Sequence, residues 1–308
     1  MNNVALVNDD LDSATASTGY CVLRPISSKL NSRYLFHWVQ TNSFVSDMMR
    51  LATGANYPAV SDKIVKGSAI PLPPLAEQKR IAAILDKADA IRRKRQQALD
   101  LTDTFLRSTF LHMFGDPVTN PMGWERAKLG EIIKFQGGSQ PSKDTFEFKP
   151  TDENVRLVQI RDFKSDKYIT YIPKRLAKRS FKEDDVMIAR YGPPVFQILK
   201  GLSGSYNVAL MKAIPLKGIN KHFLFHLLNT ERITDAVVSK SERSAGQTGV
   251  NLDFLNNYLA YCPSQKTQDK FGLIVERMEI KIKKLISNHE LSQNLFSSLQ
   301  QRAFKGKF

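Results

Sequence analysis

Apolar residues at helical spacing dominate two long stretches of the chain. In residues 74–114 they recur mostly every three or four positions from Ile81 onward, which places them on one stripe of a single helix. A Pro-Pro pair favours the helix start and Gly115 favours its end. A helix of about 40 residues is about 60 Å long at 1.5 Å per residue. Its apolar stripe therefore needs a second helix to pack against.

Residues 263–304 carry a second stripe of the same kind, beginning at Phe271. We expect the two helices to pack against each other in antiparallel orientation, because this places the intervening segments at opposite ends of the pair. The side chains predicted to pack between the helices are Ile81, Ile84, Leu85, Ala88, Ile91, Phe105, Leu106, Phe271, Ile274, Val275, Met278, Leu285, Leu295 and Leu299.

The chain repeats itself at an offset of 190 residues. Gln78 corresponds to Gln268, and the apolar positions of the two stripes coincide beyond this pair. With a slip of one residue, the segment 34–37 matches 223–226, and both contain Leu-Phe-His. Because many matches occur in order at nearly one offset, they indicate an internal duplication.

The duplication predicts four segments: a mixed segment (1–73), a long helix (74–114), a second mixed segment (115–262), and a second long helix with a short tail (263–308). The segment 115–262 combines β-rich runs with short amphipathic helices, so the predicted fold class is α+β. The first copy has no counterpart of about 116–190. We therefore expect residues 1–73 to hold only the C-terminal half of the repeated domain, and to be marginally stable or completed by another chain.

Charge adds a class of partner to this layout. The sequence has 45 Lys and Arg against 30 Asp and Glu, which gives a net charge of +15 and a pI of about 9.7. Such an excess favours a polyanion, most commonly nucleic acid. The two cysteines lack metal-type spacing, and neither a signal peptide nor a membrane span is indicated. We expect a cytoplasmic protein with reduced thiols.

Motifs for catalysis are incomplete. Residues 190–196 contain Gly-Pro-Pro, similar to the Asn/Asp-Pro-Pro-aromatic motif of adenine methyltransferases, but Gly192 and Val195 replace its functional side chains. No glycine-rich cofactor loop or phosphate-binding loop is present. Asp184 and Asp185 suit a nuclease metal site, but they also suit an ordinary turn before a strand. We expect no catalytic residue and no metal in this chain, and a standalone DNA methyltransferase or nuclease is the alternative.

Several sequence strings together resemble a known family. The string Pro-Leu-Pro-Pro-Leu-Ala-Glu-Gln at the start of 71–81, with a degenerate copy near Gln268, resembles the specificity subunit of type I restriction–modification systems. Residues 124–130, 182–192 and 246–251 also resemble parts of its target-recognition domain. The resemblance implies two such domains, each reading one half of a split double-stranded DNA sequence. It also implies an antiparallel coiled-coil spacer of two long helices between them.

The resemblance further implies that catalysis resides in partner subunits. These are two methyltransferase subunits and, through them, restriction and translocase subunits. S-adenosylmethionine, ATP and Mg²⁺ are then expected in the partners, with no cofactor in this chain. The shortened first mixed segment departs from the family, so a homodimer or a second chain is expected to complete it. A module that assembles partners through its long helices without reading DNA is a second alternative.

Candidate DNA contacts are the polar and basic side chains at turns and strand ends of the second mixed segment. Arg suits guanine O6 and N7, and Asn or Gln suits adenine. The candidates are Lys143, Arg156, Gln159, Arg161, Lys164, Arg190, Tyr191, Lys200, Ser205, Asn207, Arg243, Gln247 and Thr248. The basic run 92–95 of the first long helix either contacts phosphates or forms a solvated face.

Overall fold

The computed structural model describes residues 3–7, 11, 14–54, 58–192, 194–216, 218–244 and 247–306, with the backbone alone for 242–244, 247 and 248. The chain divides into two compact units. We call residues 1–101 and 281–308 the helical unit, and residues 102–280 the mixed unit. Among the described residues, no helix is long and apolar enough to cross a membrane.

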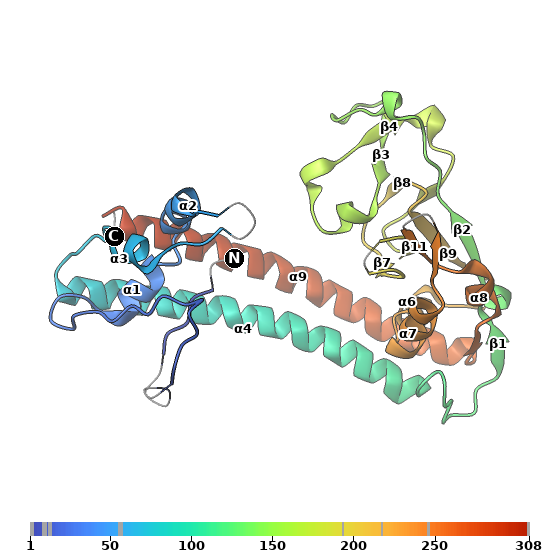
Figure 1. Cartoon of the computed structure of the whole chain (residues 1–308). Coiled ribbons are helices and arrows are strands. Elements are labelled where there is room, and N and C mark those ends of the chain that lie inside the picture. The colour runs from blue at the N-terminus through green and yellow to red at the C-terminus, as the bar shows by residue number, and fades with distance from the viewer. Residues whose placement is uncertain are drawn as a thin grey trace. The chain divides into compact units, whose positions relative to one another are not determined.

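Two helices of 40 residues each, α4 (Leu75–Phe114) and α9 (Gln265–Phe304), contribute to both units (Figure 1). Each lies within two residues of the bounds predicted from its apolar stripe. Pro74 immediately precedes α4, and Pro263 lies two residues before α9. Proline favours these places because a helix start does not need its missing N–H group.

The helical unit adds three short helices, α1 (Ser32–Trp38), α2 (Asn42–Leu51) and α3 (Asp62–Lys66). Their first turns are capped by side chains that accept backbone N–H groups, those of Asn31, Thr41 and Ser61. Tyr34 of α1 shares a buried cluster with Leu85 of α4 and Ala303 of α9. Within this unit, the beginning of α4 therefore packs beside the end of α9.

The mixed unit contains two four-stranded sheets. One has the order β2-β9-β6-β7 with antiparallel neighbours: β2 (Ile133–Gly137), β9 (Leu210–Pro215), β6 (Val186–Ala189) and β7 (Ile198–Leu199). The other has the order β4-β3-β8-β5, in which only β3 and β8 are parallel: β4 (Tyr171–Pro173), β3 (Asn154–Val158), β8 (Gly204–Tyr206) and β5 (Ser180–Phe181).

Two strand pairs and short helices complete the mixed unit. The pairs are β1 (Arg126–Lys128) with β12 (Leu259–Tyr261), and β10 (Glu242–Ser244) with β11 (Gln247–Gly249). The α-helices are α5 (Leu129–Ile132), α6 (Lys221–Leu228), α7 (Glu231–Ser239) and α8 (Leu252–Asn257). The 3₁₀ turns are η2 (Lys143–Thr145), η3 (Ile160–Phe163), η4 (Asp166–Tyr168) and η5 (Lys174–Leu176). This mixture of strands and helices confirms the predicted α+β class.

An aromatic cluster joins both long helices to α6 inside the mixed unit. Phe110 and Phe114 near the end of α4 contact Phe271 near the start of α9, with ring centroids 5.4 Å and 5.5 Å apart. Phe223 of α6 lies 5.0 Å from Phe114. All four rings are buried. The end of α4 thus packs beside the start of α9, so the contacts in each unit are those of antiparallel helices.

Gln78 and Gln268 occupy equivalent buried positions in the two copies. Gln78 Nε2 donates to the carbonyl oxygens of Lys29 and Pro73, 2.9 Å and 2.8 Å away, and its Oε1 accepts from the N–H of Asn31. Gln268 makes the same three bonds, with Gly218, Pro263 and Asn220. Since Asn31 and Asn220 in turn cap α1 and α6, each glutamine fixes the start of a long helix to the start of a short one.

The helix surfaces differ from the predicted stripe at three positions. Ile91, Phe105 and Leu295 are 43%, 49% and 57% exposed, and so do not pack between the helices as predicted. Polar side chains occupy part of the inward surface instead, namely Asp89, Thr102, His289, Ser292 and Gln300. Of the other predicted positions, Ile81, Leu85, Leu106, Phe271 and Val275 are buried, and Ile84, Ala88, Ile274, Met278, Leu285 and Leu299 are half-buried.

Candidate nucleic-acid interface

The structure brings four of the candidate DNA contacts together around the end of β3. Arg156 lies on β3, and Gln159, Arg161 and Lys164 lie in or beside the η3 turn that follows. Arg161 and Lys164 are exposed, whereas Arg156 and Gln159 are half-buried. Arg156 Nη2 forms an ion pair with Asp166 Oδ1 at 2.8 Å. This ion pair leaves Arg161 and Lys164 as the more accessible cations.

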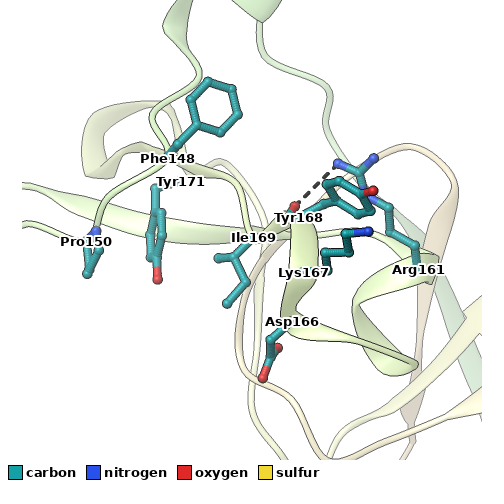
Figure 2. Close-up of a pocket in the computed structure, with 8 residues that line it drawn as sticks. All are labelled: Phe148, Pro150, Arg161, Asp166, Lys167, Tyr168, Ile169 and Tyr171. Carbon is teal, nitrogen blue, oxygen red and sulfur yellow. Dashed lines mark hydrogen bonds between the residues drawn. The ribbon is translucent and has the colours of Figure 1, made fainter. Parts of the chain in front are cut away.

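A cavity of about 380 Å³ opens beside these residues. Its lining side chains are Phe148, Pro150, Arg161, Asp166, Lys167, Tyr168, Ile169 and Tyr171 (Figure 2). Phe148 and Tyr168 are 76% and 56% exposed, and they stand on opposite sides of the cavity. Arg161 and Lys167 lie over the Tyr168 ring, with cation-to-centroid distances of 5.5 Å and 5.2 Å. The cavity therefore presents aromatic faces and positive charge together.

Most residues that line this cavity were not among the DNA contacts predicted from the sequence. Phe148, Lys167 and Tyr168 are not among the predicted contacts, and for the two aromatic residues the reason is that such side chains are more often buried than exposed. The available signal was the pairing of aromatic and basic residues at Phe163-Lys164 and at Lys167-Tyr168. That pattern is typical of surfaces that bind nucleic acid.

The side chain of Asp162 stabilises the η3 turn through a hydrogen bond to the backbone. Its Oδ2 accepts the backbone N–H of Gln159 at 2.8 Å, and its side chain is buried. Burial raises the pKa of Asp162, because a carboxylate loses hydration inside the protein, although the Gln159 bond and the charges of Arg156 and Arg161 act in the opposite direction. The carboxyl group thus anchors the turn that carries Arg161.

Arg190 and Tyr191 lie at the end of β6. The guanidinium of Arg190 is 5.2 Å from the centroid of the Tyr191 ring, and both side chains are half-buried. Tyr191 forms a backbone bridge with Gly249. A Cβ on Gly249 would lie only 2.9 Å from the Tyr191 ring, so the ring needs glycine at that position. Asn207 is half-buried, and its Oδ1 accepts the N–H of Ala209 within the turn before β9.

Two of the candidate DNA contacts have side chains that face the protein interior or contact other residues of the protein. Ser205 is buried, which leaves its hydroxyl without access to a DNA base. Lys200 forms an ion pair with Glu279 of α9 at 2.5 Å and lies 4.5 Å from the centroid of Phe225. These contacts assign Lys200 to packing inside the mixed unit. The sequence could not reveal either arrangement, because both depend on neighbours distant along the chain.

The remaining candidates divide into two groups. Lys143 is exposed in η2. The side chains of Arg243, Gln247 and Thr248 lie outside the described residues, although their backbones belong to β10 and β11.

The basic run 92–95 is largely engaged inside the helical unit. Asp89 pairs with Arg92 at 2.6 Å and with Arg93 at 2.7 Å. Arg95 donates to the carbonyl oxygen of Asn288 on α9. Arg95 thus contacts α9, whereas Arg92 and Arg93 pair within α4, and the exposed side chains of Arg93 and Lys94 stay accessible to phosphates.

The acidic pair Asp184 and Asp185 is likewise engaged by lysines. Lys221 pairs with both carboxylates, at 2.8 Å and 2.9 Å, and Lys212 also pairs with Asp185. Burial alone would raise the pKa of Asp185, but hydrogen bonds from Lys212, Lys221 and the N–H of Lys182 outweigh it and lower the pKa to about 2. No group of three or more metal-ligating side chains is assembled within the described part of the chain.

Residues 3–101 and 121–294 match the type I restriction modification DNA specificity domain. The two matched stretches cover most of the chain, and each contains one of the two buried glutamines. The chain belongs to this family. Family membership agrees with the internal duplication read from the sequence.

Named relatives within the specificity family include subunits from archaea and bacteria. The MjaVIII specificity subunit of Methanocaldococcus jannaschii is 27% identical over 239 residues, which are 66% of this chain and 53% of the relative. The EcoBI specificity subunit of Escherichia coli is 22% identical over 326 residues, covering 93% of this chain and 68% of the relative. The chain thus spans about half to two thirds of the length of these two subunits.

A solved structure shares the fold of this specificity-family chain. The S subunit of the type I restriction–modification system from M. genitalium superposes with a TM-score of 0.56 at 15% identity. The superposition covers 90% of this chain and 73% of that subunit.

Proposed function

We propose that this chain is the sequence-reading subunit of a type I restriction–modification complex and carries out no catalysis itself. Its membership of the DNA specificity-domain family carries this proposal. The net charge of +15 supports double-stranded DNA as the ligand. Base-edge contacts would supply specificity, and phosphate contacts would supply most of the affinity.

The segment 115–262 is proposed to be a complete target-recognition domain that reads one half of a split DNA sequence. The cluster around Arg161 and the exposed Lys164 supports this assignment, because accessible cations and aromatic rings gather there. Residues 1–73 would supply part of a second recognition domain, completed by a second copy of the chain or by another chain. Helices α4 and α9 would act as a coiled-coil spacer that sets the gap between the half-sites.

The proposed partners are two methyltransferase subunits and, through them, restriction and translocase subunits. Exposed apolar side chains on both long helices are surface that the docking of these partners could use. They include Leu101, Leu273, Ile280 and Leu291. S-adenosylmethionine, ATP and Mg²⁺ would bind to those partners, and the complex would act in the cytoplasm.

Reconstitution tests the proposal directly. The chain should bind a bipartite DNA sequence selectively when the methyltransferase subunits are present, and its affinity should fall steeply as salt concentration rises. DNA methylation should require both components. Turnover of S-adenosylmethionine or cleavage of DNA by the purified chain alone would contradict the proposal, as would binding without sequence preference.

A further inference from the structure

The cavity beside η3 and η4 combines exposed aromatic rings with cations, and we call it the aromatic pocket. Phe148 and Tyr168 face it from opposite sides, and Arg161 and Lys167 lie over Tyr168 (Figure 2). We propose that the aromatic pocket binds a nucleobase of the target DNA that has left the base stack. The inference rests on the proposed function and extends it by naming the ligand of one site in the recognition domain.

The exposed aromatic rings indicate that the pocket binds an unstacked base and not a base within the duplex. Inside a duplex, neighbouring base pairs cover both faces of each base, so only base edges and phosphates are accessible. Those groups can reach Arg161 and Lys167, and a thymine methyl group can touch an aromatic ring, but they cannot stack face to face on Phe148 or Tyr168. A base that has swung out of the helix offers its face to aromatic side chains, and enzymes that extrude bases hold them in this way. Phe148 is the ring such a base would stack on first, because Arg161 and Lys167 lie over Tyr168 and would have to move aside there.

The segment that carries Phe148 is fixed before any ligand arrives. Glu147 and Tyr171 exchange two backbone hydrogen bonds, at 2.9 Å and 2.8 Å. The buried Asn154 donates from Nδ2 to Glu147 Oε2 at 2.6 Å and to the Lys149 carbonyl oxygen at 2.9 Å. The exposed ring of Phe148 therefore sits between two anchored residues. Such preorganisation lowers the entropy cost of binding.

The charges of the aromatic pocket favour a polyanion. Asp166 is the one acidic side chain among the eight lining residues, and Arg156 already pairs with it. Arg161 makes only a long ion pair with Asp162, at 3.9 Å, so Arg161 and Lys167 can neutralise phosphates on either side of an extruded nucleotide. A nucleotide within DNA satisfies the rings and the cations together, which makes it the favoured ligand.

The test uses the full chain in complex with its methyltransferase subunits and a duplex that carries the methylated target found in cells. 2-Aminopurine is placed at each position of the half-site in turn, because its fluorescence rises when it unstacks. Because the methyltransferase subunits themselves extrude the base that they methylate, we expect a second position, distinct from the methylated base, to brighten on binding. A mismatch at that position should tighten binding, since the base is then easier to extrude.

Variants of the two rings connect that signal to the pocket. Phe148→Ala with Tyr168→Ala should abolish the fluorescence rise and weaken binding about tenfold or more, because each stacked base contributes roughly 5- to 150-fold in affinity. Phe148→Trp and Tyr168→Phe keep an aromatic face and should retain both. Lys178→Ala, a change at an exposed cation outside the pocket lining, is the control and should alter neither. Melting curves of every variant verify folding.

Four outcomes would overturn the inference. Loss of affinity in Arg161→Ala and Lys167→Ala, with no effect of the ring variants, would make the site a phosphate contact. Loss of methyltransferase binding with unchanged DNA binding would make it a protein-docking surface. If the wild-type complex showed no sequence selectivity at all, the proposed function would fall together with the pocket. Selective binding that the ring variants leave unchanged would overturn the pocket alone.

Discussion

At the scale of single residues, the structure separates side chains that hold the fold from side chains that remain free to meet a ligand. Among the polar residues beside turns, Asp185 and Ser205 are buried, and Lys200 is half-buried and held by an ion pair with Glu279. Phe148 and Tyr168 are large aromatic residues, yet both are exposed. Residue type alone predicts exposed polar and buried aromatic side chains. The structure differs because burial depends on which distant segments of the chain meet.

Asp185 should contribute measurable stability that depends on pH. Its pKa is about 2 in the folded protein, below the value of about 4 for an unfolded aspartate. The stabilisation is therefore present above pH 4 and is lost as pH falls through 2. Asp185→Asn should lower the free energy of unfolding by about 2 kcal/mol at pH 7.

Thermal unfolding of the full chain between pH 7 and pH 2 measures this effect. The difference between Asp185→Asn and wild type should shrink below pH 4, whereas Asp184→Asn, at a more exposed carboxylate, should change little at any pH. A difference that stays constant down to pH 2 would show that the charge of Asp185 is not the source.

At the scale of elements, the sequence predicted the helices well and their packed surfaces less well. Both 40-residue helices follow from periodicity, since the helical spacing of apolar residues continues with neither Pro nor a turn signal to divide it. Ile91, Phe105 and Leu295 fit the period yet are exposed. Buried polar residues such as His289 take inward positions, and hydrophobic periodicity cannot detect them.

Alanine substitutions on α4 test the packed surface. Leu85 is fully buried whereas Ile91 is exposed. Leu85→Ala should cost about 2–5 kcal/mol of stability, and Ile91→Ala should stay near 0.5 kcal/mol. Chemical denaturation of both variants measures these losses in the free energy of unfolding. Equal losses would show that Ile91 packs between the helices after all.

The buried glutamines should behave as a matched pair. Gln268→Met keeps the side-chain volume but leaves the N–H of Asn220 and the carbonyl oxygens of Gly218 and Pro263 without their partner. Each unsatisfied buried group costs about 1–3 kcal/mol. We expect a loss of several kcal/mol in thermal unfolding, and a similar loss for Gln78→Met.

Lys270→Met changes an exposed position of the same helix and serves as the control. It should shift the melting temperature little. If Gln268→Met were equally mild, the three hydrogen bonds of Gln268 would not be what fixes the start of α9 to α6.

At the scale of the whole molecule, the duplication explains the order of parts along the chain. Each copy has a short helix, a buried glutamine and a long helix, and one copy of this arrangement lies in each matched stretch of the specificity-domain family. The sequence predicted this order because repetition survives divergence at single positions. It could not predict the aromatic pocket, which forms only when the segment before β3 meets η3, η4 and β4.

On the proposed function, residues 115–262 determine which DNA sequence the complex reads. The most direct measurement maps methylated bases across the genome of cells that contain this chain and its methyltransferase subunits. The map is then repeated after residues 115–262 are exchanged for another recognition domain of the family. We predict a bipartite methylated motif in which the exchange alters one half and leaves the gap unchanged. An unaltered motif, or the same methylation without this chain, would contradict the account.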